Sequence, residues 1–271
     1  MRRLLFKKST ILAILTVGFC VLAFQLYRIY QDTQTKLAQT RSRLIEQNLV
    51  TFEKVRLNPH PHKSFAQIIQ NTSDTRDLTY YQDSYFAATG GGLLQLSREG
   101  KKQKHFTVLD GLPESDLTAL AVFDAKLFIG TRTKGIVTFD GKEFMQFRFS
   151  ECETQAVTIF LNDSGRLLVG TFNGGLLEFD GKVLREIKAE NKTIKEINYL
   201  EKISATLYVG TFNNGLWIYE SDVWKHFTTA EGLPSNRIVG VVKNNENLLV
   251  ATDFGLSVLE NEKFRTIKIL T

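Results

Sequence analysis

The sequence predicts an all-β protein: a β-propeller of five four-stranded blades, preceded by one transmembrane helix and a helical stalk. Three observations predict it. A similar segment recurs five times, with its threonine at Thr89, Thr131, Thr171, Thr211 and Thr252. A period near 40 residues filled with short strands and turn residues is typical of propeller blades. An uncharged stretch lies near the N-terminus, and a polar segment without Pro or Gly follows it.

Residues 9–27 form the predicted transmembrane helix, because this uncharged run is long enough to cross about 30 Å of hydrocarbon. Residues 1–8 form a basic tip with Arg2, Arg3, Lys7 and Lys8, and the positive-inside tendency places it in the cytoplasm. We therefore expect a bacterial single-pass protein of the inner (cytoplasmic) membrane, with its propeller in the periplasm or outside the cell. A cleaved signal peptide is the alternative, since Val21 and Ala23 suit a cleavage site.

Residues 28–50 form the predicted stalk, because this segment is rich in helix-forming residues. A weak heptad spacing runs through Leu26, Tyr30, Thr33, Leu37, Thr40 and Leu44. It allows two interpretations: a homodimer through the stalk, or a solvated helical spacer. Residues 51–62, which end in Asn-Pro-His-Pro-His, are expected to be a linker, and the propeller domain then covers residues 63–271.

Each repeat contains the signals of a strand meander. Alternating apolar residues such as Leu207 and Val209 predict a strand with one face in a sheet interface. The next residue is always small, which predicts a crowded position: Ala88, Gly130, Gly170, Gly210 and Ala251. Asn214-Gly215 and Asp180-Gly181 predict tight hairpins after the second and third strands.

Two connections between repeats have nearly the same sequence. Asp110-Gly111-Leu112-Pro113 and Glu231-Gly232-Leu233-Pro234 both follow His-Phe-Thr. The Gly and Pro predict a bend, and the Leu is expected to fill the gap between neighbouring sheets.

These motifs together resemble the two-component regulator propeller repeat. The likeness rests on strand-Gly-Thr-x-x-x-Gly-Leu, Phe-Asp-Gly and Phe-Thr-x-x-x-Gly-Leu-Pro, and it covers roughly residues 65 to 269. The resemblance implies an extracytoplasmic, sensor-type propeller like those of hybrid histidine kinases. The sequence departs from that pattern, because it has five clear blades rather than the common seven and contains no kinase motif. We therefore expect no phosphorelay within this chain.

The sequence leaves the closure of the ring open. Lys63–Gln70 has the phase of a fourth strand and is a candidate closing strand, although Lys263–Leu270 already supplies a fourth strand for the last blade. The alternatives are five blades with residues 63–70 as an added edge, or six blades with a degenerate one drawn from residues 49–70.

The charge distribution argues against a nucleic-acid partner. The net charge is +5, but eight basic and two acidic residues lie among the first 50, so the remaining 221 residues carry a net charge of −1. Phosphate recognition needs a clustered basic surface on the folded part. The predicted propeller has no such excess.

The residues indicate neither catalysis nor a bound cofactor. His60 and His62 flank prolines without nearby metal-ligand partners, and His105 and His226 occupy one repeat position that suits a structural role. No hydrolase, metalloprotease or phosphate-loop motif occurs. The nearest catalytic candidates are Asp124, Glu151, Glu153 and Glu196. We expect no metal, no cofactor and no enzymatic activity.

The candidate binding residues lie in loops that are expected to emerge on one face, namely those between the second and third strands and those between blades. They are Arg132, Lys134, Phe172, Asn173, Phe212, Asn213, Asp253, Phe254 and Arg237. Exposed aromatic residues among mixed charges suit a protein, peptide or glycan partner. The simpler alternative is that the phenylalanines pack between blades.

The predicted function is that of a membrane-anchored extracytoplasmic propeller that binds such a partner, as a tethered sensor or a scaffold module. The alternative is a propeller hydrolase or lyase acting on a polysaccharide or lactone. Convergent carboxylates or a histidine pair in the channel would favour the enzyme.

Overall fold

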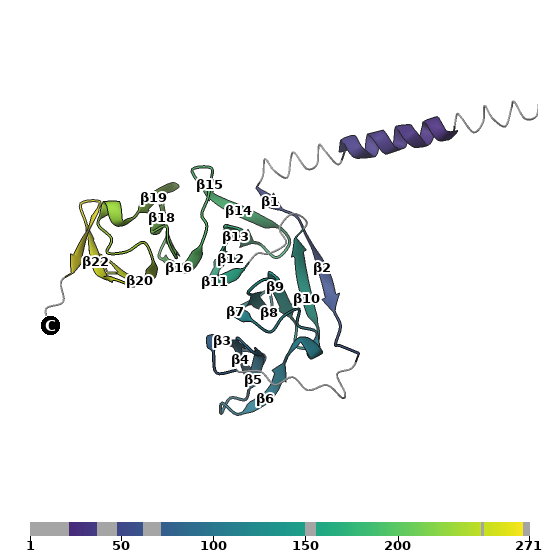
Figure 1. Ribbon diagram of the computed structural model, residues 1–271, viewed down its shortest axis with the longest axis horizontal. Helices are drawn as coiled ribbons and strands as arrows, with labels where there is room; N and C mark the ends of the chain where they lie inside the picture. The colour runs from purple at the N-terminus through teal and green to yellow at the C-terminus, as the bar shows by residue number, and fades with distance from the viewer. Residues whose placement is uncertain (1–21, 37–47, 62–71, 150–155, 245–246, 268–271) are drawn as a thin grey trace, which may run out of the picture. The chain divides into compact units, whose positions relative to one another are not determined.

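The computed structural model of the 271-residue chain describes residues 22–36, 48–61, 72–149, 156–244 and 247–267 (Figure 1). The chain divides into two compact units, residues 1–49 and 50–271. In the first unit, residues 22–36 form a helix. The predicted basic tip, most of the predicted transmembrane segment and residues 37–47 of the stalk lie outside the described residues.

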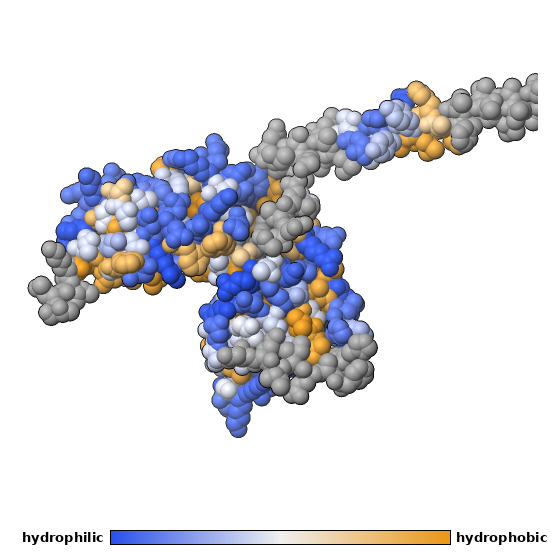
Figure 2. Space-filling model, in the orientation of Figure 1, coloured by the Kyte–Doolittle hydropathy of each residue, from blue (hydrophilic) through white to orange (hydrophobic). Residues whose placement is uncertain are grey.

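The described helix changes character along its length. Its first half exposes six large apolar or aromatic side chains, Leu22, Phe24, Leu26, Tyr27, Ile29 and Tyr30, and Figure 2 shows orange atoms at this end. Its second half is polar, and Lys36 pairs with Asp32. Within the described residues, no helix is both long and apolar enough to cross a membrane.

The second unit is built from strand meanders. Its described residues form five antiparallel sheets, which we call blades 1 to 5. Blade 1 contains β3 (Thr75–Tyr81), β4 (Ser84–Thr89), β5 (Gly92–Leu96) and β6 (Lys102–Phe106); blade 2 contains β7 (Leu117–Phe123), β8 (Lys126–Thr131), β9 (Ile136–Phe139) and β10 (Phe144–Phe149). Blade 3 contains β11 (Val157–Asp163), β12 (Arg166–Thr171), β13 (Leu176–Phe179) and β14 (Leu184–Ala189). Blade 4 contains β16 (Ile197–Ile203), β17 (Thr206–Thr211), β18 (Leu216–Glu220) and β19 (Val223–Phe227); blade 5 contains β20 (Ile238–Lys243), β21 (Leu248–Thr252), β22 (Gly255–Glu260) and β23 (Lys263–Ile267).

The first strands of successive blades contact one another, in the order β3, β7, β11, β16 and β20. In the part of the chain that the structure describes, no strand pairing joins blade 5 to blade 1. The candidate closing strand, residues 63–70, lies outside the described residues. The five meanders confirm the all-β repeat, whereas closure of the ring stays a prediction.

The threonine of each repeat forms hydrogen bonds within the hairpin between the second and third strands of its blade. The hydroxyl of Thr211 donates to the carbonyl oxygen of Gly215 at 2.9 Å and accepts from the amide of Asn214 at 2.8 Å. The same Thr-to-Gly bond occurs in the other four blades at 2.7–3.0 Å. The threonines are buried. Buried backbone groups need hydrogen-bond partners. The threonine hydroxyl supplies them inside each hairpin, which explains why this residue recurs.

The small residue before that threonine faces the next blade. A Cβ atom added to Gly130, Gly170 or Gly210 would lie 2.7 Å from a side-chain atom of Val157, Ile197 or Ile238, the first residue of the following inner strand. The predicted crowding is confirmed in these three blades. The connections between blades also agree with expectation, because Leu112 and Leu233 are buried in the cores beside them.

Residues 49–57 form strands, whereas residues 49–50 were expected in the helical stalk, residues 51–57 in the linker, and the alternative placed all of them in a degenerate sixth blade. Phe52–Leu57 forms β2, which pairs antiparallel with β10 and adds a fifth strand to blade 2. β1 (Leu49–Val50) lies beside β14 of blade 3 in the strand order. The ring of Phe52 stacks on Phe147 with centroids 4.7 Å apart and meets the edge of Phe179 at 6.1 Å. Aromatic contacts with two blades explain why this segment forms a strand.

Candidate binding groove

A groove with a volume of ≈ 530 Å³ lies where blades 4 and 5 meet. Three segments line it: the hairpin loop after β17, the connection between the blades, which includes the short 3-10 helix η2 (Thr229–Glu231), and the turn after β21. The lining residues are Phe212, Asn213, Thr229, Pro234, Ser235, Asn236, Arg237, Asp253 and Phe254. These loops come from the same end of the two meanders.

Hydrogen bonds hold the floor of the groove in place. The backbone carbonyl of Asn236 accepts from the amide of Gly215 at 2.9 Å, and its side-chain Oδ1 accepts from the amide of Thr229 at 2.9 Å. The hydroxyl of Ser235 accepts from the amide of Arg237 at 3.1 Å. Asn236 therefore ties the connection to the blade 4 hairpin and to η2, which fixes the position of Arg237.

A capping box shapes η2 itself. The side chain of Thr228 accepts from the amide of Ala230, and Glu231 accepts from the amide and hydroxyl of Thr228 at 2.7 and 2.8 Å. The hydrogen bonds from Thr228 hold the pKa of the Glu231 carboxyl below its ordinary value. Thr107 and Asp110 make the same box in the 3-10 helix η1 (Val108–Asp110), between blades 1 and 2.

Aromatic rings and one arginine form a row along this face. The guanidinium of Arg237 lies over the ring of Phe212, 5.4 Å from its centroid. The ring centroid of Phe172 lies 5.7 Å from that of Phe212, with the two rings tilted. The row joins loops of blades 3 and 4 to the connection before blade 5, so these phenylalanines contact each other between blades and also face outward in part.

The turn of blade 5 supplies the rim. Phe254 is 78% exposed, although its amide donates to the hydroxyl of Thr252 at 3.3 Å. Asp253 is exposed, and its carboxylate forms no hydrogen bond or ion pair with another described residue. Among the described residues, Phe254 is the most exposed of the large hydrophobic side chains.

The structure brings five of the nine sequence-predicted residues into the groove: Phe212, Asn213, Arg237, Asp253 and Phe254. Phe172 adjoins it through Phe212, and Asn173 lies in the same loop as Phe172. Arg132 and Lys134 lie apart, in the hairpin loop of blade 2. Four residues beyond the nine candidates also line the groove: Thr229, Pro234, Ser235 and Asn236. The contrast between Gly-Leu-Pro-Ser-Asn-Arg here and Gly-Leu-Pro-Glu-Ser-Asp before blade 2 is the signal that distinguishes them.

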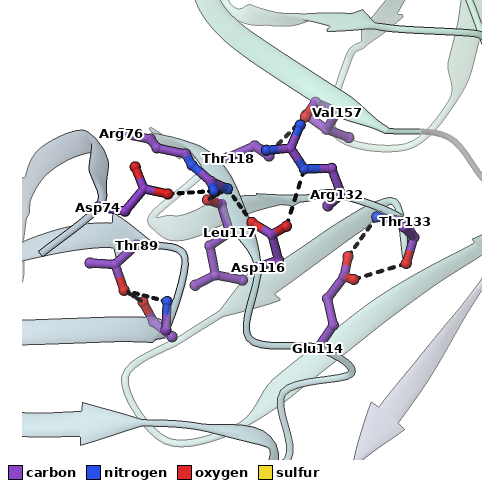
Figure 3. Close-up of polar contacts among 12 residues, drawn as sticks. Asp74, Arg76, Thr89, Glu114, Asp116, Leu117, Thr118, Arg132, Thr133 and Val157 are labelled. Atoms are coloured by element: carbon purple, nitrogen blue, oxygen red, sulfur yellow. Dashed lines mark hydrogen bonds and ion pairs between the residues drawn. The ribbon is translucent and has the colours of Figure 1, made fainter. Parts of the chain in front are cut away.

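Arg132 is neutralised within an ionic cluster between blades 1 and 2 (Figure 3). Its Nε donates to Asp116 at 3.1 Å, and Asp116 also pairs with Arg76, whose other nitrogen donates to Asp74 at 2.6 Å. Burial opposes ionisation of Asp116, but the hydrogen bonds from Arg76 and Arg132 outweigh it and hold the pKa of this carboxyl below its ordinary value. Arg132 therefore serves to hold the blade 2 loop.

The amide of Lys134 is likewise engaged. It donates to the carboxylate of Glu114 at 3.1 Å and to the hydroxyl of Thr131 at 3.0 Å. Glu114, from the connection before blade 2, thus holds the backbone of the blade 2 hairpin, and it also accepts from the amide and hydroxyl of Thr133.

The two catalytic candidates that the structure describes, Asp124 and Glu196, are not brought together. Asp124 lies in the turn after β7, whereas Glu196 precedes β16 at the opposite end of the meander and accepts from the side chain of Asn213 at 3.0 Å. Glu151 and Glu153 lie outside the described residues. Among the described residues, no three His, Cys, Asp or Glu side chains could hold a metal ion together.

The two repeat-related histidines make the same contact. The Nε2 atom of His105 bonds the carbonyl of Gly91 at 2.8 Å, and that of His226 bonds the carbonyl of Asn214 at 2.7 Å. His226 also stacks on Trp217 with centroids 3.8 Å apart. Both histidines therefore secure the loop between the second and third strands, which agrees with the structural role expected for them.

Repeated four-stranded meanders whose inner strands contact each other define an all-β protein of β-propeller type. No protein-family model matches the chain, and no curated protein matches its sequence. Solved structures do. The extracellular domain of a protein described as a hybrid two-component system from B. thetaiotaomicron is similar over 73% of this chain and 31% of its own, with a TM-score of 0.56 and 15% identity.

A second extracellular domain of this description, from the same organism, is similar over 71% of this chain and 28% of its own, with a TM-score of 0.54 and 20% identity. A virginiamycin B lyase from Staphylococcus aureus is similar over 82% of this chain and 75% of its own, with a TM-score of 0.56 and 14% identity. The chain thus spans about a third or less of the two-component domains. At these identities the likeness shows the fold alone, and it supports the propeller fold that the repeats predict.

Proposed function

We propose that this chain is an extracytoplasmic binding module of propeller type, tethered to a membrane, that holds a protein, peptide or glycan partner in the groove between blades 4 and 5. The observation that carries the proposal is the groove itself, where Phe254 stands exposed beside two charged side chains, Arg237 and Asp253, that form no ion pair with a described residue. Such a surface is built for a contact rather than for packing.

The tether rests on the N-terminal helix. Six large apolar or aromatic side chains are exposed within residues 22–30, directly after the uncharged residues 9–21. Exposing so much apolar surface to water costs about 25 cal/mol per Å², and a bilayer removes that cost. The polar half of the helix then begins at the membrane surface, and the blades lie outside the cytoplasm, as in the extracellular domains of similar fold.

We further propose that the module binds without catalysing a reaction, as a sensor or a scaffold. Asp124 and Glu196 lie at opposite ends of their meanders, which supports this. The signal or assembly would then depend on a partner protein within or outside the membrane.

Binding is tested with the full-length protein in lipid nanodiscs, using pull-down from membranes and ligand-induced shifts of the melting temperature. We expect Phe254→Ala to abolish capture of the partner without changing the melting temperature of the free protein. Val223→Ala, at an exposed position of β19, serves as the matched control and should bind as wild type. Absence of any partner and of any thermal shift would contradict the proposal.

The topology is tested separately with a reporter fused after Thr271. The proposal expects reporter activity only outside the cytoplasm, and activity inside the cytoplasm would overturn the tether.

A further inference from the structure

The groove contains one charge of each sign, and the two do not pair with each other. Arg237 and Asp253 both line it, yet no ion pair joins them. Elsewhere in the described chain, seven arginines form ion pairs with carboxylates: Arg56, Arg76, Arg98, Arg132, Arg166, Arg185 and Arg265. Arg237 forms no ion pair with a described residue, as is also true of Arg28 and Arg148, but of these three arginines only Arg237 lines the groove.

The orientation of Arg237 leaves its donors available. The guanidinium carbon of Arg237 lies over the ring of Phe212, 5.4 Å from its centroid, and this cation–π contact uses none of the N–H groups. Among the described residues, no oxygen accepts from the guanidinium. A guanidinium with free N–H groups can bind a carboxylate with two parallel hydrogen bonds.

The amides of the groove are less available than its charges. Oδ1 of Asn236 accepts from the amide of Thr229, and Nδ2 of Asn213 donates to Glu196. A neutral glycan relies on such amides and on hydroxyl groups, whereas the unpaired groups here carry full charges. The balance therefore favours a ligand that carries both an anion and a cation.

Building on the proposed function, we infer that the groove binds a zwitterionic amino acid or short peptide with an apolar side chain. Its carboxylate would lie on Arg237, its ammonium group on Asp253 and its apolar side chain against Phe254. The groove volume of ≈ 530 Å³ falls within the range of small-molecule sites, about 300–1,000 Å³.

The test uses calorimetry on the full-length protein in nanodiscs. The probes are a panel of free amino acids and dipeptides with apolar side chains, the N-acetylated and C-amidated forms of any dipeptide that binds, and neutral oligosaccharides. We expect a free dipeptide to bind, and each capped form to bind at least about tenfold more weakly, because a charge-assisted hydrogen bond is lost in each case.

Two variants assign the charges. Arg237→Gln should remove the effect of C-amidation and leave that of N-acetylation, and Asp253→Asn should do the reverse. Both variants should keep the wild-type melting temperature, since both residues are exposed.

Capped and free peptides binding equally, or both variants responding alike, would overturn the inference. Oligosaccharide or folded-protein binding that depends on Phe254, without dipeptide binding, would also overturn it and leave the proposed function standing. If no peptide, glycan or protein binds, the proposed function fails as well.

Discussion

Gly210 lies directly against Ile238 of the next blade: a Cβ atom at Gly210 would come within 2.7 Å of the Ile238 Cβ and 2.9 Å of the Tyr199 Cβ. Such close approach of β17 to β20 is possible only where a side chain is missing. The two residues are near the groove in the sequence, because Phe212 comes two residues after Gly210 and Arg237 directly precedes Ile238.

Gly210→Ala should therefore lower the free energy of unfolding by about 1–3 kcal/mol, the usual cost of overpacking. Gly240→Ala is the matched control, because nothing lies within 4 Å of its Cβ position, and it should leave stability unchanged or raise it by up to about 1 kcal/mol. Chemical unfolding followed by the fluorescence of Trp217 and Trp224, both in blade 4, measures the difference. Equal stability of the two variants would contradict the packing argument.

Thr211→Val should destabilise the protein by about 1–2 kcal/mol, because it removes the hydroxyl that accepts from Asn214 and donates to Gly215 in a buried hairpin. Thr266→Val, on an exposed position of β23, should change stability by no more than about 0.5 kcal/mol. The same unfolding experiment compares them. A loss at Thr266 as large as that at Thr211 would show that the hairpin bond is not the cause.

Phe52→Ala should cost about 2 kcal/mol, because the half-buried ring contacts Phe147 and Phe179 in two blades. It should also speed hydrogen exchange in β10, whose outer edge β2 covers. Glu53→Ala, which removes an exposed side chain of the same strand, is the control. Unchanged exchange in β10 of the Phe52 variant would mean that residues 52–57 behave as a linker after all.

Asp180 makes stability depend on acid pH. The backbone amides of Val183 and Lys182, followed by Arg185, lower the pKa of this carboxyl to about 2, from an ordinary value of 3.8. The folded state then holds the charged form more strongly than the unfolded chain does, so this contribution is full above about pH 4 and is lost as the pH falls toward 2. Asp180→Asn should reduce stability at pH 7, and its difference from wild type should shrink over that interval. A difference that does not vary with pH would exclude the carboxylate as its source.

The repeat and its local chemistry could be predicted from the sequence because they are set by short-range requirements. Thr211 supplies hydrogen bonds inside a hairpin, Gly215 is required by the turn, and Leu233 fills the gap between neighbouring sheets. The same requirements recur about every 40 residues. The resulting periodicity was sufficient to identify the blades and the loops that carry the candidate site.

Only the tertiary structure decided which loop residues are free to bind. Arg132 and Arg237 were both selected as loop residues of one face, but Asp116 neutralises the first, while the second contacts the ring of Phe212 and leaves its N–H groups free. The pairing of β2 with β10 is equally invisible in the sequence, since the two strands are about 90 residues apart. Ion pairs and the pairing of edge strands depend on contacts between segments that are far apart in the sequence. A local sequence pattern contains no information about those contacts. The repeats therefore determined the fold class, whereas the tertiary structure determined which charged loop residues have no ion pair and line the groove.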